Sequence, residues 1–178
     1  MKPINIMLDL ETWGTKPGSV ITSIGAVVFN DEAITDTFYA RIDPKSAMEA
    51  GLLVDADTIL WWMKQSDEAR AEFSRSAYHI ETALADFSRW CLAGREGDPV
   101  LWGNGATFDN ALLRAAYEAC GIVAPWGPFS DRCYRTAKSY RPGIKMARTG
   151  THHNALDDAR SQAEHLIRIH KAMGVTVA

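Results

Sequence analysis

Two carboxylates, Asp9 and Glu11, stand near the end of the apolar run INIMLDLE. A buried strand should exclude both, because an unpaired charge moved out of water costs several kcal/mol. On a strand, residues two apart point to the same face, with Cα atoms roughly 6–7 Å apart. Either the two side chains escape to solvent at the strand end, or a cation lies between them.

Two later segments add acids and a histidine in places where chemistry is conceivable. Asp109 follows a Gly-Asn-Gly turn and falls in the first turn of an expected helix, where the macrodipole alone stabilises an acid by about 0.3–1 kcal/mol. In HHNALDDA, His153 comes just before a helix and Asp158 lies in its second turn. Asn154 is the expected N-cap and Asp157 its capping partner, which leaves Asp158 without a structural role.

The elements that must position these side chains follow from hydrophobic patterning. Apolar and β-branched runs joined by short connections predict an antiparallel meander of three strands, at 4–11, 20–29 and 37–42. Helical spacing and short buried runs then predict helices at 57–73, 79–94, 107–121 and 154–173, with a strand at 99–103 and a short segment around 130–140. This order predicts an α/β fold, a mixed central sheet flanked by helices, in a single domain spanning 1–178.

Composition narrows the function classes. The chain has 178 residues, with 47% hydrophobic and 23% charged residues, which is ordinary for a globular protein. No window approaches the roughly 20 apolar residues of a membrane span, and no secretory signal is visible. Three cysteines at wide spacings indicate a reducing compartment. We therefore expect a cytoplasmic protein without a membrane partner.

Charge is distributed unevenly along the chain. The formal net charge is −3, yet the segment from Asp131 to Arg148 holds six basic residues and one acid. We call these six the basic strip: Arg132, Arg135, Lys138, Arg141, Lys145 and Arg148. A solvated helix face would explain a charge run, but this one interrupts an otherwise acidic protein and predicts contact with a polyanion such as nucleic acid.

In combination, these motifs resemble a known family. Asp-x-Glu on a first strand, an Asp in FDNALL and a late His-x-Ala-x-x-Asp-Ala are similar to the three exonuclease motifs of the DnaQ-like, or DEDDh, 3′–5′ exonucleases. The resemblance runs from about Ile4 to Leu166. The segments DLETWGTKPGSVITSIGAVVF and WWMKQSDEAR look most like small phage- and prophage-type exonucleases and their bacterial exoribonuclease relatives.

The resemblance implies a ribonuclease H-like fold and a metal-dependent site. It assigns two divalent metal ions to four carboxylates, and it makes His153 the general base; the four are Asp9, Glu11, Asp109 and Asp158. Hard oxygen ligands favour Mg²⁺ or Mn²⁺. A cation between Asp9 and Glu11 would also explain two acids at the end of an apolar strand.

The last motif can be read in two registers. His152 and Asp157 have the same separation as His153 and Asp158, so spacing alone admits both pairs. The alanines of the family motif match Ala155 and Ala159, which selects His153 and Asp158.

Substrate contacts are expected beside these motifs. The resemblance places Thr12, Trp13 and Gly14 against the terminal nucleotide, although Trp13 could instead pack over the sheet edge. Of the adjacent Trp61 and Trp62, one is expected in the core and the other, taken as Trp62, beside the cleft. Further candidates are Asn104, Phe108, Arg141, Lys145 and Arg148. A turn role for Asn104 and a packing role for Phe108 are the alternatives.

The predicted activity is metal-dependent hydrolysis of phosphodiester bonds at the 3′ end of single-stranded or frayed nucleic acid. One alternative is an inactive nucleic-acid-binding module, which the five filled catalytic positions disfavour. The other is a hydrolase of small phosphorylated molecules, which the basic strip and the aromatic residues disfavour. The sequence decides neither RNA against DNA nor the oligomeric state; many members of the family are homodimers, but no feature of this sequence decides whether this chain is one.

Overall fold

A mixed sheet of five strands forms the centre of the protein. The computed structural model describes residues 3–176, so the two outermost residues of the predicted domain at each end lie outside it. The strand order is β3-β2-β1-β4-β5. β1 pairs antiparallel with β2, and β2 with β3, whereas β1–β4 and β4–β5 are parallel. The strands are β1 (Ile4–Thr12), β2 (Ile21–Phe29), β3 (Ile34–Arg41), β4 (Pro99–Gly103) and β5 (Asp131–Cys133).

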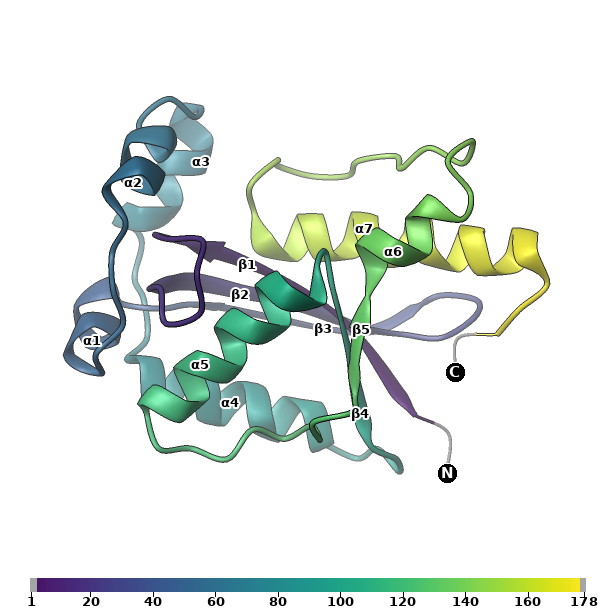
Figure 1. Cartoon of the computed structure of the whole chain (residues 1–178), viewed down its shortest axis with the longest axis horizontal. Coiled ribbons are helices and arrows are strands. Elements are labelled where there is room, and N and C mark those ends of the chain that lie inside the picture. Colours follow the sequence, from purple (N-terminus) through teal and green to yellow (C-terminus); the bar gives the residue numbers. More distant parts are fainter. Residues whose placement is uncertain (1–2, 177–178) are drawn as a thin grey trace.

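Helices cover both faces of this sheet (Figure 1). α4 and α5 lie against one face, α6 and α7 lie against the other, and α1 to α3 gather beyond the end of β1. The helices are α1 (Pro44–Glu49), α2 (Ala56–Trp62), α3 (Asp67–Ala71), α4 (Ile80–Leu92), α5 (Ala111–Ala119), α6 (Tyr134–Ser139) and α7 (Ala155–Met173). A 3₁₀ turn follows α3 at Glu72–Ser74, and a π-helical turn precedes α5 at Ala106–Asn110. No helix within residues 3–176 is both long and apolar enough to cross a membrane.

The alternation of side chains along β1 divides the core in two. Ile6 and Leu8 join the core under α4 and α5, whereas Met7 joins the core under α6 and α7. Since side chains on a strand alternate between its faces, Asp9 and Glu11 follow Met7 toward α7. The mixed sheet with flanking helices confirms the predicted fold class.

Several predicted boundaries were wrong. The helix expected over 57–73 breaks after Trp62, and Ser66 starts a separate α3 by accepting a hydrogen bond from the Ala69 amide. β3 begins at Ile34 rather than residue 37, because its polar residues face solvent on an edge strand and resemble a turn in sequence. α1, which Asp43 caps, was not predicted at all.

Candidate active site

The carboxylates of Asp9 and Glu11 lie at the end of β1 where α7 begins. Gly25 of β2 is paired with Asp9, and a Cβ on this glycine would come within 2.1 Å of the Ala155 backbone. A side chain there would push the first turn of α7 off the sheet. Glycine therefore lets Asp158 approach β1, and carboxylate oxygens of Asp9, Glu11 and Asp158 all lie within 4.8 Å of one another.

The N-cap of α7 is the residue that the sequence predicted, whereas Asp157 is not its capping partner, because the Asn154 amide donates to the Thr151 carbonyl. The side chain of Asn154 accepts hydrogen bonds from the amides of Leu156 at 3.1 Å and Asp157 at 3.2 Å, which confirms it as the N-cap. The carboxylate of Asp157 accepts from the Thr151 amide at 2.8 Å. Asp157 thus has a structural partner, whereas Asp158 faces the cluster.

Asp109 reaches the same place from the turn after β4. It is only 2% exposed, and its Oδ2 has no hydrogen-bond partner among the described residues. A Cβ at Gly103 would lie 2.2 Å from Asn110 Oδ1 and 3.1 Å from Asp109 Oδ2, so glycine makes room for this turn. Asp109 is not part of the 4.8 Å cluster, but it lines the same cavity.

Burial and mutual repulsion make this group of acids unfavourable on its own. Burial, followed by the charges of Asp109, Glu11 and Asp158, raises the pKa of Asp9 well above its usual range. Burial is also the main cause that raises the pKa of Glu11 to about 8 and that of Asp109 to about 7. Buried oxygen donors suit hard divalent cations, and Asp109 Oδ2 has no hydrogen-bond partner among residues 3–176, so these residues fit the metal ions that the sequence predicted.

The two adjacent histidines lie at the mouth of this cluster. His153 has a left-handed backbone with φ of 63°, which is uncommon outside glycine, and its amide donates to Asp158 Oδ2 at 3.2 Å. Its ring stacks on His152 with centroids 3.8 Å apart and meets Trp61 edge-on at 5.0 Å. Burial, followed by the neighbouring His152, lowers the pKa of His153.

A cavity of about 630 Å³ surrounds the acids and has two different walls. One, the aromatic wall, is formed by α2 and the residue before it, and consists of Asp55, Asp57, Thr58, Trp61 and Trp62. The other, the basic wall, consists of Arg135, Lys138, Met146 and Arg148. A cation-rich surface thus faces a surface of indole rings and acids across the cluster.

The structure brings some predicted substrate residues to the cavity. Its lining includes Thr12, Asn104, Phe108, Trp62 and Arg148. Trp62 is 4% exposed and donates from its indole to the carbonyl of Thr12 at 2.8 Å, so much of its surface serves the core. Its neighbour Trp61 is 44% exposed and presents the more accessible ring.

Four other predicted substrate residues are not among those that line the cavity. Trp13 is half-buried and packs edge-on against Phe73, with centroids 5.7 Å apart. A Cβ at Gly14 would meet Ser19 Oγ at 2.4 Å, so this glycine permits close packing of the loop. Arg141 donates to the adjacent Tyr140 carbonyl, and Lys145 is exposed. Their positions do not support the predicted substrate contacts.

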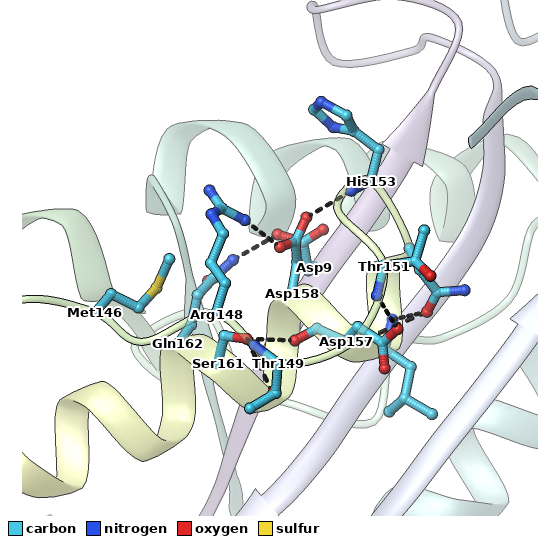
Figure 2. A network of polar contacts seen from close by, with 12 residues as sticks. Asp9, Met146, Arg148, Thr149, Thr151, His153, Asp157, Asp158, Ser161 and Gln162 are labelled. Carbon is cyan, nitrogen blue, oxygen red and sulfur yellow. Dashed lines mark hydrogen bonds and ion pairs between the residues drawn. The ribbon is translucent and has the colours of Figure 1, made fainter. Parts of the chain in front are cut away.

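The segment that carries the end of the basic strip is fastened along α7. We call residues 141–153 the strap. The Thr149 amide donates to Ser161 Oγ at 3.1 Å, and His165 Nε2 donates to the Ile144 carbonyl at 2.7 Å. Figure 2 shows the end of this network, where Asp157 and Ser161 hold the strap and Arg148 pairs with Asp158 at 2.5 Å.

Among the side chains that contact the acids, sequence reasoning missed Gln162 altogether. Gln162, one turn after Asp158 on α7, donates from Nε2 to Asp9 Oδ1 at 2.7 Å. Its spacing of four from Asp158 was the available signal, since residues four apart share a helix face. Arg135 and Lys138 belonged to the basic strip but had not been singled out.

Comparisons with known proteins agree with this geometry. Residues 4–170 match the family model described as the 3′-5′ exoribonuclease Rv2179c-like domain. A search of curated proteins finds no match.

Solved structures with the same fold include the nuclease domain of 3′hExo, a DEDDh family member, bound to rAMP. The TM-score is 0.61 at 16% identity, over 94% of this chain and 92% of that one. Exonuclease X in complex with 5′ overhanging duplex DNA gives 0.59 at 19% identity, over 96% and 93%. A 3′-exonuclease that recognises the 3′ end of a histone mRNA stem-loop gives 0.61 at 15%, over 97% and 84%.

Proposed function

The chain belongs to the Rv2179c-like 3′-5′ exoribonuclease domain family and is a 3′–5′ exonuclease; from this premise we propose that it removes nucleotides from single-stranded or frayed RNA. The observation that carries the proposal is the cluster of Asp9, Glu11 and Asp158, with Asp109 beside it, at the floor of a cavity between a basic and an aromatic wall. The family description favours RNA over DNA as the substrate.

The four carboxylates would hold two divalent cations, Mg²⁺ or Mn²⁺. Such ions supply charge neutralisation at the attacked phosphate and lower the pKa of a bound water. Burial keeps the acids in a weakly screened environment, and the unpartnered Asp109 Oδ2 gives them one further free donor oxygen. Asp9 and Glu11 come from one strand and Asp158 from α7, so the packing of α7 on β1 assembles the ligand set.

His153 would act as the general base. Because burial lowers its pKa, the imidazole is neutral and able to accept a proton near neutral pH. Contacts with Trp61 and His152 restrain the ring, and the bond from the His153 amide to Asp158 ties the residue to the acid cluster. This arrangement supports a base that is oriented before substrate binds.

The two walls would bind different parts of the substrate. Arg135, Lys138 and Arg148 can bind the phosphates of the strand that leads into the cavity. Trp61 offers an exposed ring on which a base can stack, an interaction worth about 1–3 kcal/mol per base. Neither wall reads base edges in any way that the structure shows, so we expect little sequence preference.

Labelled oligonucleotides test the proposal directly. A single-stranded RNA labelled at its 5′ end should give a ladder of shortened products with Mg²⁺, whereas a 3′ label should be released at once as mononucleotide. Matched DNA and duplex substrates at the same salt concentration define the preference. Release of a 5′ label as mononucleotide, or no cleavage with Mg²⁺ or Mn²⁺, would contradict the proposal.

Three further expectations, from the sequence or from the family resemblance, stay predictions. They are the organisation of 1–178 as a single domain, a homodimer in solution and a cytoplasmic location. Sedimentation equilibrium tests the homodimer, because it gives the mass of the particle that the chain forms.

A further inference from the structure

Gln162 is a buried polar residue that the family motifs do not include. The last motif, HNALDDA, ends at Ala159, and Gln162 lies three residues beyond it in α7. The residue is only 4% exposed and lines the cavity. Figure 2 shows its side chain reaching across to Asp9, and the Nε2–Oδ1 distance is 2.7 Å.

The chemistry of the two partners fixes how the amide is turned. In the state that binds a cation, Asp9 is an ionised carboxylate, which can only accept hydrogen bonds, so the NH₂ group of Gln162 faces Asp9. The carbonyl oxygen then points elsewhere, and this Oε1 is buried without a hydrogen-bond partner among residues 3–176. A buried acceptor without a donor costs free energy. Methionine would fill the same space without that cost, so packing alone does not explain a glutamine here.

We propose that Gln162 is a positioning residue that holds the carboxylate of Asp9 in one orientation for cation binding. The bond to Oδ1 restrains the carboxylate and leaves Oδ2 free to act as a ligand. The Oε1 atom, which has no partner among residues 3–176, accepts a hydrogen bond from water in the cavity. The inference rests on the proposed metal-dependent function and assigns no direct contact between Gln162 and the substrate.

The charges around Asp9 indicate what the hydrogen bond from Gln162 contributes. Asp9 lies among acids that repel it, whereas Arg148 is paired with Asp158. The neutral amide stabilises the charged form of Asp9 without bringing a cation that would compete with the metal. Residues that orient metal ligands through hydrogen bonds typically change metal affinity by about 10- to 100-fold when they are mutated.

The test measures cation binding without substrate. In Gln162→Met the side chain keeps its approximate volume and loses both polar atoms. We expect Mn²⁺ titrated into the whole chain by calorimetry to bind about 10- to 100-fold more weakly than in the unmodified protein. Tyr117→Phe is the control, because it deletes a buried hydrogen bond under the opposite face of the sheet and should leave Mn²⁺ affinity unchanged.

Two further measurements separate positioning from packing. At saturating Mn²⁺ the KM of Gln162→Met for an oligonucleotide should stay within about twofold of the unmodified value, while the Mn²⁺ concentration for half-maximal rate rises with the Kd. In an Asp9→Asn background, Gln162→Met should have no additional effect on Mn²⁺ binding, because the two residues act through one bond. Unchanged Mn²⁺ affinity in a folded Gln162→Met protein would overturn the inference.

A second variant covers the case in which methionine is not tolerated. Gln162→Glu keeps the size of the side chain but replaces the donor with a carboxylate beside Asp9. In EDTA its thermal midpoint should fall below that of the unmodified protein, and added Mn²⁺ should raise it by more. Midpoints equal to those of the unmodified protein in both conditions would refute the contact. If the unmodified protein binds Mn²⁺ but cleaves no oligonucleotide, the proposed function fails while the role of Gln162 is still measured.

Discussion

The two walls of the cavity are built in different ways. The basic wall combines α6, which carries Arg135 and Lys138, with the strap, which has no regular secondary structure. Polar side chains of α7 such as Ser161 and His165 bind the backbone of the strap. The aromatic wall depends on α2, a helix of seven residues held by ring contacts, including Trp62 against Phe73 at 4.8 Å. One wall is fastened by hydrogen bonds to a long helix, the other by packing between short elements.

This difference in construction matches the group that each wall presents to the cavity, a cationic side chain in one and an indole ring in the other. An irregular segment leaves backbone amides and carbonyls without partners, so a strap that holds Arg148 at the cavity needs donors and acceptors from elsewhere. Trp61 needs only a surface against which its ring can rest. We expect the basic wall to respond to pH and salt, and the aromatic wall to respond to the loss of ring area.

The largest loss of activity should follow from changes to the acids that lie between the two walls. Asp9→Ala should reduce hydrolysis to background, because it removes a proposed ligand of the metal ions. The metal-free protein should keep or raise its thermal midpoint, since the change also removes a buried charge that its neighbours repel. Turnover of a labelled RNA and melting in EDTA measure the two results. Substantial residual turnover in Asp9→Ala or Asp158→Asn would contradict the two-metal assignment.

The histidine at the junction of the walls should have the next largest effect. His153→Ala should lower kcat by about 10²- to 10⁴-fold, as expected for the loss of a positioned base. His152→Ala and Asp157→Asn should be mild, because Asp157 has a structural role in binding the Thr151 amide. Single-turnover rates at saturating metal distinguish the variants. A severe loss in His152→Ala with a mild one in His153→Ala would reverse the assigned register.

Salt dependence should separate the basic wall from the rest of the basic strip. In an Asp9→Ala background, changing Arg135 and Lys138 together to Ala should lower the salt slope of oligonucleotide binding by about 1.4, or about 0.7 for each phosphate contact. Arg141 and Lys145 changed together to Ala form the matched control, because neither lines the cavity. Fluorescence anisotropy across a salt series gives both slopes. Equal salt slopes for the two double variants would show that the residues of the basic wall contact phosphates no more than the rest of the basic strip does.

The aromatic wall should show the opposite behaviour. In the same background, Trp61→Ala should weaken oligonucleotide binding by about 1–3 kcal/mol with an unchanged salt slope, since stacking releases no counterions. The anisotropy series used for the basic wall measures this variant as well. A reduced slope, or undiminished affinity, would show that Trp61 does not stack on a base.

The smallest effect should be on how the free energy of unfolding depends on pH, through the histidine that binds the strap. Neutral His165 accepts from the hydroxyl of Tyr134 at Nδ1 and donates to the Ile144 carbonyl, and burial lowers its pKa. As pH falls below about 6.5, the unfolded chain binds a proton that the folded chain resists, so His165 lowers the free energy of unfolding there. Urea unfolding at pH 7.5 and pH 5 should show a larger fall for the unmodified protein than for His165→Gln. The same fall in both would exclude this role.

Local sequence determined most of the site's parts. The two-residue period of β1 places Asp9 and Glu11 on one face whatever the rest of the chain does, and the capping pattern at Asn154 places Asp158 in the second turn of α7. The basic strip was also visible as a departure from an acidic background. These predictions depend on neighbours in sequence, so no knowledge of distant contacts was needed.

Tertiary packing decided which of these parts meet. Arg135 and Lys138 face the cavity while Arg141 and Lys145 do not, because α6 and the strap turn relative to α7 in a way that charge patterning does not encode. Gly25 lets the start of α7 approach β1, and this contact brings Gln162 to Asp9 across 153 residues of sequence. Periodicity fixes the face of an element on which a side chain lies; only the packing of elements far apart in the chain fixes what that face meets.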